Sequence, residues 1–417
     1  MINPEELMPF LELPDIEVER LFLEKKKVLK IFVNSTKDGC HCHRCGKPID
    51  DGYGLGQEVT LRHLPMFGYQ SYIVIRPKRY RCLVCDHQPT TTQTQTWYTP
   101  KSPFTHAYEQ ALMRSLINST VHDVSLKHDV GPDAIQGVLN RQIDAQINWE
   151  TISDIEIIGI DEISLKKGHR DFVVIVSSYL EGELRVLGIL PDRKKDTVID
   201  FFRSIPKRLR KTVKMVCSDL YQGFIGAAKA VFGSRVAVCA DRFHVAKLYR
   251  EGVEKLRKQE MKRLHQELNK TEYKALKNVH WILRKRRREL TSDERQILNR
   301  LFQQSPKIQQ AYEFCEALTA IYDAPLLKGQ GKRKIKGWMT RVANSELTCF
   351  NSFLKTLNTY LEEITNYFID RQTSGFVEGL NNKIKVLKRR CYGITNQKHL
   401  FQRVSLDLCG YARFSSC

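Results

Sequence analysis

Between residues 155 and 240, the hydrophobic residues fall into short, nearly continuous runs separated by segments with helical periodicity. Such runs predict buried strands, and the intervening segments predict amphipathic helices. The predicted order is three strands, a helix, a strand, a helix and a strand, at residues 155–160, 172–180, 183–190, 197–205, 212–217, 222–232 and 235–239. Apolar strands that alternate with helices are typical of a sheet covered on both faces, so this region predicts an α/β domain.

Residues 246–370 lack the strand pattern and are almost wholly helix-forming and highly charged. The basic run Arg284–Arg288 is expected on a helix, where five successive side chains cannot all face one partner. It is therefore as compatible with a solvated surface as with phosphate contacts. The Gly- and Lys-rich stretch Lys328–Gly337 predicts a flexible loop between helices, and a final helix is predicted from Gly375.

Three short helices are predicted ahead of the α/β region, at residues 105–118, 120–128 and 132–147. A sharp break at Val130–Gly131 precedes Pro132, which is well suited to the first turn of a helix. Two short helices joined by a Gly-containing turn predict a helix-turn-helix, whose second helix would enter the major groove of DNA. A helical hairpin that packs without binding DNA has the same pattern.

The charge of the chain indicates a class of partner. Its 417 residues include 67 Lys and Arg against 47 Asp and Glu, a formal net charge of +20. A surplus of this size favours a polyanion, because each phosphate that a cation neutralises releases counterions. Nucleic acid is therefore favoured over the alternative of a merely basic protein. The hydrophobic content of 42% is ordinary for a folded protein, so general disorder is not expected.

No export signal or membrane span is predicted. Met1–Phe10 carries Glu5 and Glu6 instead of a basic stretch followed by an apolar run, and no uninterrupted apolar stretch is long enough to cross a bilayer. We therefore expect a cytoplasmic protein whose 12 cysteines are reduced. In that compartment, closely spaced cysteine pairs favour a metal site over disulfides.

Two Cys-x-x-Cys pairs lie in the N-terminal part of the chain, separated by strand-like residues 59–64 and 70–81. Two thiolate pairs on turns can supply four ligands to one tetrahedral Zn²⁺, and a site closed in this way is structural. The predicted zinc ligands are Cys42, Cys45, Cys82 and Cys85. Their identity stays open, because further candidate ligands lie nearby at Cys40, His41, His43 and His87. The Thr- and Gln-rich residues 90–96 that follow are expected to form a linker.

Acidic residues end three of the predicted α/β strands, at Asp161, Asp219 and Asp241. Carboxylates at the carboxyl ends of neighbouring strands point into the crevice where open α/β sheets bind ligands. Each aspartate also has a structural alternative as a turn former or helix N-cap, and this alternative applies most to Asp219. Glu162 follows Asp161 directly, so its side chain is expected to point to the opposite face of the sheet.

Several segments resemble bacterial insertion-sequence transposases of the ISL-three family, which are of the DDE type. They are Gly159–Glu162, Lys167–Arg170, Ala240–His244, Val377–Lys385 and Lys388–Gly393. The resemblance also includes the cysteine pairs and the helix-turn-helix, so it extends over nearly the whole chain. It implies a zinc ribbon at residues 1–95 and a helix-turn-helix DNA-binding domain at 100–150. It further implies an RNase H-like catalytic core, a mixed α/β sheet with flanking helices, at 151–245 and 371–417. An α-helical insertion at 246–370 would interrupt that core.

The resemblance implies a catalytic triad of Asp161, Asp219 and Glu378. In the family, the first acid follows the first strand, the second follows the fourth strand, and the glutamate lies on a late helix. Three carboxylates suit two divalent cations about 3.5–4 Å apart, and hard oxygen ligands favour Mg²⁺ or Mn²⁺. Asp241 is the rival for the second position. Glu378 has an alternative as a favourable charge in the first turn of a basic helix.

The expected reaction is DNA cleavage by water, which exposes a 3′-hydroxyl, followed by attack of that hydroxyl on target DNA. The expected partners are double-stranded DNA, in the form of terminal inverted repeats and target DNA, and at least a second copy of the chain. The residues expected to contact DNA flank Glu378: Lys383, Lys385, Lys388, Arg389 and Arg390. Two other functions remain open, a non-catalytic DNA-binding regulator and a metal-dependent nuclease that does not join DNA.

Overall fold

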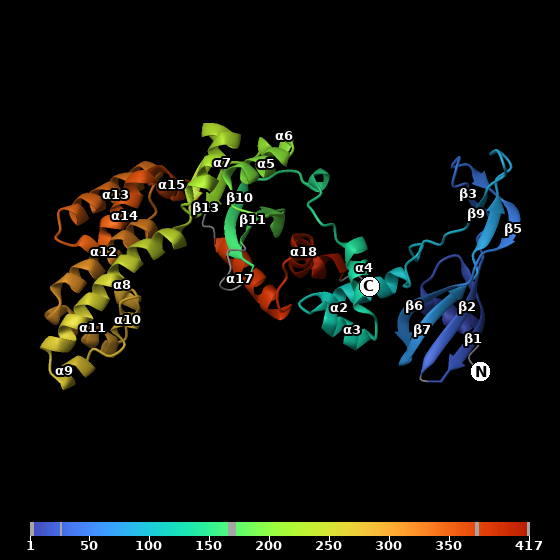
Figure 1. The fold of residues 1–417 in the computed structure, drawn as a ribbon, viewed down its shortest axis with the longest axis horizontal. Coiled ribbons are helices and arrows are strands. Elements are labelled where there is room, and N and C mark those ends of the chain that lie inside the picture. Colours follow the sequence, from blue (N-terminus) through green and yellow to red (C-terminus); the bar gives the residue numbers. More distant parts are fainter. Residues whose placement is uncertain (1–3, 26, 166–171, 372–374, 415–417) are drawn as a thin grey trace. The chain divides into compact units, whose positions relative to one another are not determined.

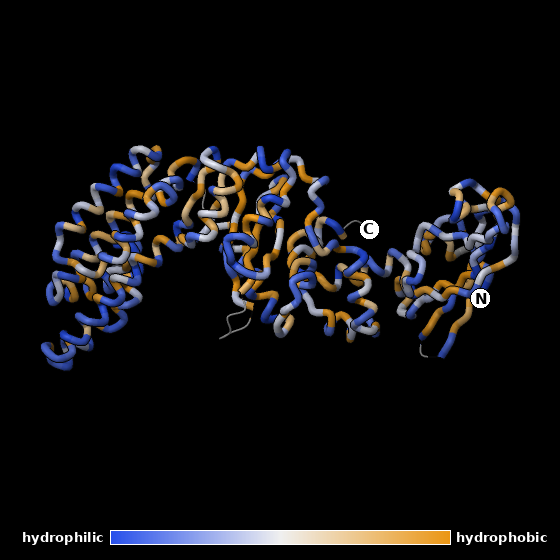
Figure 2. The backbone as a smooth tube through the Cα atoms, turned by 45° about the horizontal axis from the view of Figure 1, so that its top comes forward, coloured by the Kyte–Doolittle hydropathy of each residue, from blue (hydrophilic) through white to orange (hydrophobic). Residues whose placement is uncertain are grey.

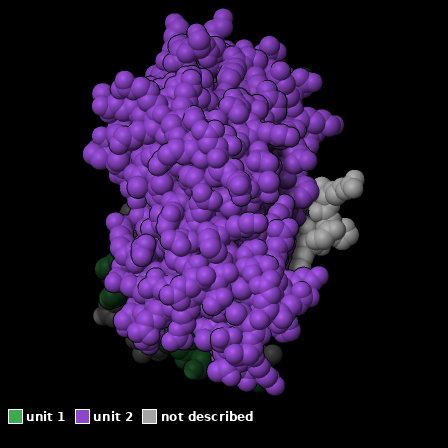
Figure 3. All heavy atoms as spheres, turned by 90° about the vertical axis from the view of Figure 1, so that its left-hand side faces the viewer, with its two compact units in different colours: residues 1–144, 405–417 green, residues 145–404 purple. Residues whose placement is uncertain are grey.

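The computed structural model describes residues 4–25, 27–165, 172–371 and 375–414 (Figure 1). It divides the chain into two compact units, one of Met1–Asp144 with Ser405–Cys417 and one of Ala145–Val404 (Figure 3). The motif segment Lys167–Arg170 lies outside the described residues. No helix in the described ranges is long and apolar enough to span a membrane.

The first unit begins with a four-stranded sheet in the order β1-β2-β7-β6. β2 and β7 are parallel, and the outer pairs are antiparallel. Apolar side chains on one face, such as Ile31, Leu61 and Ile73, pack with Leu7 and Leu11 of the N-terminal helix α1. The elements are α1 (Pro4–Leu11), β1 (Ile16–Glu24), β2 (Val28–Ser35), β6 (Val59–Met66) and β7 (Tyr69–Ile75).

The cysteine pairs lie between and beside short strands of this unit. They are β3 (Cys40–His41), β4 (Pro48–Ile49), β5 (Asp51–Leu55), β8 (Lys78–Arg81) and β9 (Thr90–Thr92). The prediction of a linker at 90–96 is wrong in part, because β9 pairs with β8. Gln93 is buried and donates to the carbonyl oxygens of Lys37 and Gly39, both at 3.0 Å. These threonines and glutamines therefore form part of the folded unit.

Three helices follow, as the sequence predicts: α2 (His106–Leu116), α3 (Val121–His128) and α4 (Pro132–Gln142). Threonine side chains cap the first two, since Thr105 accepts from the Tyr108 amide and Thr120 from the Asp123 amide. Pro132 occupies the first turn of α4. The final helix α18 (Gln397–Phe414) adds Leu406 to the apolar core that these helices share.

The second unit contains a five-stranded mixed sheet in the order β12-β11-β10-β13-β14. β10, β11 and β12 are antiparallel neighbours, whereas β13 and β14 continue the sheet parallel to β10. The apolar runs therefore do form a sheet (Figure 2). Its strands are β10 (Ile157–Ser164), β11 (Phe172–Leu180), β12 (Glu183–Leu190), β13 (Met215–Ser218) and β14 (Ala237–Ala240).

Helices pack on both faces of this sheet. Ile158 and Ile160 of β10 share a core with Phe202 of α5 (Lys195–Ser204) and Phe224 of α7 (Gln222–Phe232). The short helix α6 (Lys207–Arg210) lies in the chain between those two. On the other face, α17 (Gly375–Arg390) packs along β10, and α15 (Leu361–Thr365) packs against β14.

A helical region connects β14 to α17, and its core includes the fully buried Trp338 and Phe350. Its long helix α8 (Arg242–Glu267) begins directly after the sheet. The following helices are α9 (Lys270–Lys274), α10 (Val279–Ile282), α11 (Ser292–Gln304), α12 (Pro306–Asp323), α13 (Lys328–Ala343), α14 (Asn351–Thr359), α15 and α16 (Tyr367–Asp370).

Two expectations for this region are wrong. Lys328–Gly337 is not a loop but most of α13, because Ile335, Trp338 and Val342 form a buried stripe with helical spacing. Arg284–Arg288 is not on one helix, since α10 ends at Ile282 and a 3₁₀ turn follows. Acidic side chains of α11 and α12 pair with two members of this run and stabilise the turn.

Candidate active site and metal centre

Three aspartates lie side by side at one edge of the five-stranded sheet. The parallel pairing of β10 with β13, and of β13 with β14, aligns the residues immediately before Asp161, Asp219 and Asp241. Neighbouring strands are about 4.8 Å apart, so the three side chains start from adjacent backbone positions. This edge therefore concentrates negative charge.

Asp161 lies within β10 and not at its end, because the strand continues to Ser164. Its carboxylate accepts a hydrogen bond from the backbone N–H of Glu162 at 2.7 Å and another from the side-chain amide of Asn381 on α17. Burial raises the pKa of the Asp161 carboxyl, and these two hydrogen bonds oppose the shift. A bound cation would favour the ionised form of this carboxyl.

Asp219 follows β13 and accepts a hydrogen bond from the backbone N–H of Tyr221 at 3.1 Å. The N-cap of α7 is Tyr221 itself, with no side-chain capping bond, so Asp219 forms a local turn and does not cap the helix. Burial raises the pKa of the Asp219 carboxyl, and the negative charge of Asp161 raises it further. The two carboxylates therefore interact electrostatically across the sheet edge.

Asp241 is the residue with a capping role. One of its oxygens accepts from the backbone N–H of Phe243 at 2.8 Å, which makes Asp241 the N-cap of α8. The other lies 3.0 Å from Nδ1 of His244. This hydrogen bond raises the pKa of His244, and the charges of Asp241, Asp161 and Asp219 act in the same direction. Asp241 thus fixes the start of α8 and holds an imidazole beside the other two aspartates.

Helix α17 follows β10 closely. A Cβ atom at Gly159 would lie 2.7 Å from a ring carbon of Phe376 and would also clash with Val377, so the approach of helix to strand requires glycine here. Further along α17, Lys388 donates to the carbonyl oxygen of Ser164 at the end of β10. The helix is therefore attached to the strand over its whole length.

Glu378 lies in the first turn of α17 with an exposed side chain. Within the described ranges, its carboxylate makes no hydrogen bond or ion pair, and the residue of α17 that contacts Asp161 is Asn381. The structure thus brings Asp161 and Asp219 together and places Glu378 on the helix that packs on β10. Glu378 and Asn381 are three residues apart and lie on neighbouring positions of one helical face.

Asn381 was not assigned a role from the sequence. Its side chain is 5% exposed, and its amide oxygen has no hydrogen-bond partner among the described residues. The signal that could have found it is its spacing of three residues from Glu378, which places both on one face of the helix. The neighbouring Asn382 is exposed.

The side chain of Glu162 pairs with Arg193, at 3.1 Å between carboxylate oxygen and guanidinium nitrogen.

Of the basic residues expected to contact DNA, Lys388 donates a hydrogen bond to the carbonyl oxygen of Ser164, and burial lowers the pKa of Lys388. The exposed members of that set are Lys385 and Arg389, and the half-buried members are Lys383 and Arg390.

The four predicted zinc ligands lie together in the first unit. Their Sγ atoms are all within 4.8 Å of one another, the closest contacts being 3.9 Å between Cys42 and Cys85 and 3.8 Å between Cys45 and Cys82. No other set of three or more Cys, His, Asp or Glu ligand atoms is this close in the described residues. This Cys₄ cluster could bind a metal ion.

Backbone hydrogen bonds favour the thiolate form of one cysteine in the cluster. The amides of Cys45 and Arg44 lower the pKa of the Cys42 thiol to about 6, and the Arg44 amide lies 3.4 Å from its sulfur. Hydrogen bonding to Cys45 raises the pKa of Cys85 to about 12, because a thiol that donates to its neighbour retains its proton. Ligands of this type bind metals as thiolates.

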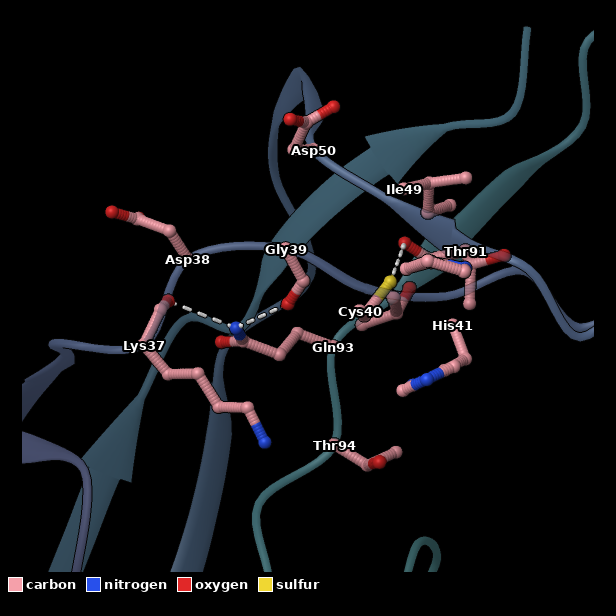
Figure 4. Close-up of a pocket in the computed structure, with 12 residues that line it drawn as sticks. Lys37, Asp38, Gly39, Cys40, His41, Ile49, Asp50, Thr91, Gln93 and Thr94 are labelled. Atoms are coloured by element: carbon pink, nitrogen blue, oxygen red, sulfur yellow. Dashed lines mark hydrogen bonds between the residues drawn. The ribbon is translucent and has the colours of Figure 1, made fainter.

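The other candidate zinc ligands lie outside the cluster. The Cys40 thiol is directed at the carbonyl oxygen of Thr91, and Nδ1 of His43 lies 3.0 Å from the Thr91 hydroxyl. Cys40 and His41 line a separate pocket beside the sheet of β5, β8 and β9 (Figure 4). The alternative ligands left open by the sequence therefore do not belong to the group of four sulfurs.

Comparison with known proteins identifies the family. A sequence profile of the ISL3 type of DDE transposases, described as Transposase, matches residues 158–404, more than half of the chain. The chain belongs to this ISL3 family of transposases. The transposase is an enzyme that acts on DNA, and the resemblance stated from its motifs is confirmed.

Curated relatives extend the similarity over nearly the whole transposase. The transposase for insertion sequence element IS1001 of Bordetella parapertussis is 26% identical over 393 residues, which are 93% of each chain. The transposase for IS1557 of Mycobacterium tuberculosis is 21% identical over 394 residues, 89% of this chain and 86% of the relative. A non-catalytic regulator is accordingly not favoured.

Proposed function

We propose that this transposase cleaves DNA at the terminal inverted repeats of its insertion sequence and joins the ends to target DNA, with Asp161, Asp219 and Glu378 as metal ligands. The observation that carries the proposal is the register-matched position of Asp161 and Asp219 on neighbouring parallel strands. The transposase family supplies the reaction class.

The strand order supports an RNase H-like core. β10 is the first strand of the sheet along the chain and β13 the fourth, which are the two positions that the family pattern gives to its aspartates. α17 is a late helix that packs on β10 and carries Glu378. The helices from α8 to α16 would then be an insertion that separates the second acid from the third.

The carboxylates suit Mg²⁺ or Mn²⁺, which prefer hard oxygen ligands. Bound cations would activate the attacking oxygen and stabilise the leaving one. The burial that raises the pKa values of Asp161 and Asp219 makes their ionised forms costly in the absence of positive charge. Asn381 would orient Asp161, and α17 would bring Glu378 to the same edge of the sheet.

Asp219 is preferred to Asp241 as the second ligand because their hydrogen bonds differ. Both oxygens of Asp241 have partners, one at the first turn of α8 and one at His244. Among the described residues, Asp219 accepts one hydrogen bond, from the backbone N–H of Tyr221, and its second oxygen is therefore the more available for a cation. His244 would act beside the site as a positively polarised group near the DNA phosphate.

The reaction proceeds in two steps. A water oxygen bonds to phosphorus, the bond to the 3′ oxygen breaks, and that oxygen takes up a proton to give a free 3′-hydroxyl. This hydroxyl then loses its proton and bonds to phosphorus in target DNA, which releases a new 3′-hydroxyl on the target strand. No bond to the protein forms in either step.

The Cys₄ cluster is proposed to hold structural Zn²⁺. A tetrahedral zinc ion with Zn–S distances of about 2.3 Å separates its sulfurs by about 3.8 Å, which agrees with the contacts of 3.8 and 3.9 Å. With four protein ligands, no position is left for a substrate. The zinc ribbon and the α3–α4 helix-turn-helix would recognise the terminal repeats, with two or more copies assembled on DNA.

The test is strand transfer of a pre-cleaved element end into a plasmid in Mg²⁺. We expect an end with a 3′-hydroxyl to be joined and an otherwise identical 3′-deoxy end to remain unjoined. Asp161→Asn should join neither end. A nuclease without joining would cut the plasmid in the presence of either end and join neither, and a protein–DNA adduct that resists denaturation would contradict the two-step mechanism.

A further inference from the structure

A groove of about 470 Å³ lies along the first half of α8, inside the helical region. One wall is a stripe on α8 that includes Phe243, Lys247, Arg250 and Arg257, at intervals of four, three and seven residues. These positions share one face of the helix. The opposite wall is formed by the end of α10 and the residues after it, and α12 also lines the groove.

The groove is predominantly positive. Six cationic side chains line it against three carboxylates, which leaves an excess of three positive charges. The cations are Lys247, Arg250, Arg257, Arg284, Lys285 and Arg286, and the carboxylates are Glu251, Glu254 and Glu316. Such an excess in a concave surface attracts a polyanion more strongly than the same charges on a flat surface.

Ion pairs occupy some of these cations but not all. Arg257 pairs with Glu254 at 2.6 Å, and Lys285 and Arg286 pair with acids of α11 and α12. Arg250 and Arg284 have no ion pair within the described ranges. Arg284 instead lies over the ring of Trp281, 5.1 Å from its centre. These two arginines are the ones available to phosphate.

Exposed aromatic rings flank the groove. Phe243, at its start, is 53% exposed, and Trp281, beside Arg284, is 58% exposed. Large exposed rings among cations are suited to the sugar and base surfaces of nucleic acid. A DNA-binding surface would use both the rings and the charges.

The groove begins close to the acidic edge of the sheet. Phe243 is the second residue after Asp241, and its ring lies 5.9 Å from that of His244. From Phe243 to Arg257, α8 extends about 21 Å at 1.5 Å per residue. A strand that leaves the acidic edge can therefore continue along α8.

We propose that this groove is a second DNA-binding site of the transposase, which holds the backbone of the DNA adjacent to the phosphodiester being cleaved. Arg250 and Arg284 contact phosphates, and Phe243 contacts the sugar or base nearest the acidic edge. The proposal rests on the proposed function for the identity of the DNA. It gives the helical insertion a role in substrate binding that is separate from the helix-turn-helix.

The test measures the salt dependence of binding between the full-length transposase and a fluorescent duplex that carries an element end. The double variant Arg250→Ala/Arg284→Ala removes two groove cations. The control Lys255→Ala/Lys258→Ala removes two exposed cations of α8 that do not line the groove. Both variants change the net charge equally, and thermal unfolding checks that both are folded.

We expect the slope of log K against log salt to become shallower by about 1.8 for the groove variant, at roughly 0.9 per phosphate contact, and to stay unchanged for the control. The proposal would be overturned if the groove variant had the same slope as the wild type. It would also be overturned if the groove variant and the control variant changed the slope by the same amount. Asp161→Asn separates the groove proposal from the proposed catalytic function, because this variant should abolish cleavage without changing the salt slope. A cleaving Asp161→Asn enzyme would contradict the proposed function alone.

Discussion

The side-chain amide of Asn381 donates a hydrogen bond to the carboxylate of Asp161, which precedes it by 220 residues. This contact connects α17 to β10 at the strand that carries the first aspartate. It also fixes the orientation of a carboxylate whose pKa is raised by burial. Asn381 thus contacts Asp161 directly from the helix that carries Glu378.

Asn381→Ala should weaken Mn²⁺ binding by about 10- to 100-fold, because residues that orient a metal ligand have effects of this size. Titration calorimetry measures the affinity, and a cleavage assay over a range of Mn²⁺ concentrations should show a loss that excess metal partly restores. Asn382→Ala is the matched control, since Asn382 is the exposed neighbour on the same helix. Equal affinities in the two variants would exclude a positioning role.

Asp219→Asn should abolish strand cleavage, whereas Asp241→Asn should retain part of it. Asparagine caps helices about as well as aspartate, so the second variant keeps the N-terminus of α8 intact. Gel analysis of a labelled element end in Mg²⁺ distinguishes them. If only Asp241→Asn loses cleavage, Asp241 is the second ligand and our assignment is wrong.

The buried carboxyls should also affect stability. A folded-state pKa raised above the unfolded value means that Asp161 and Asp219 favour folding at low pH, and that this contribution is lost as the pH rises through the folded pKa. In the metal-free protein at neutral pH, Asp219→Asn should therefore raise the melting temperature above that of the wild type. The difference should shrink as the pH falls through the range where carboxyls protonate.

With Mg²⁺ the wild type should instead melt at a higher temperature than Asp219→Asn. The cation stabilises the ionised carboxylates of the wild type and binds Asp219→Asn weakly. Differential scanning calorimetry with and without Mg²⁺ measures both effects. A wild type whose melting temperature does not respond to Mg²⁺ at any pH would argue against a metal site at this edge.

Cys45→Ser should remove bound zinc, because it breaks a cluster in which all four sulfurs lie within 4.8 Å. We expect about one zinc per chain in the wild type, a large loss in the variant, and earlier thermal unfolding of the N-terminal region. Cys40→Ser is the control, since its thiol is directed at Thr91 and lies outside the cluster. Elemental analysis showing equal zinc in both variants would contradict the Cys₄ assignment.

The sequence predicts local elements well where burial imposes a clear pattern. The strands around Asp161 and Asp219 are nearly continuous apolar runs because helices cover both faces of their sheet. The cysteine cluster is predictable because the pair spacing limits the possible geometries. The strand order is not readable in this way, since register depends on contacts between residues far apart in the chain.

Residue composition gives a wrong secondary-structure prediction where it is weighed above the periodicity of the hydrophobic residues. The glycines and lysines of Lys328–Gly337 suggest a loop, yet Gly331 is buried against Phe368, and Lys328 and Lys332 pair with Glu362. The contact between Asn381 and Asp161 could not be read from either segment alone, because it depends on how α17 packs on β10. Glu378, which makes no hydrogen bond or ion pair within the part of the chain that the structure describes, is the site residue assigned mainly from its motif.

The most direct test of the central claim therefore concerns Glu378. Labelled element ends are incubated with Mg²⁺ and either the wild type or Glu378→Gln, which preserves the shape of the side chain and removes its charge. We predict cleaved and joined products from the wild type and none from Glu378→Gln, with equal DNA binding by both proteins. Equal joining by the two proteins would contradict the assignment of Asp161, Asp219 and Glu378 as the catalytic triad.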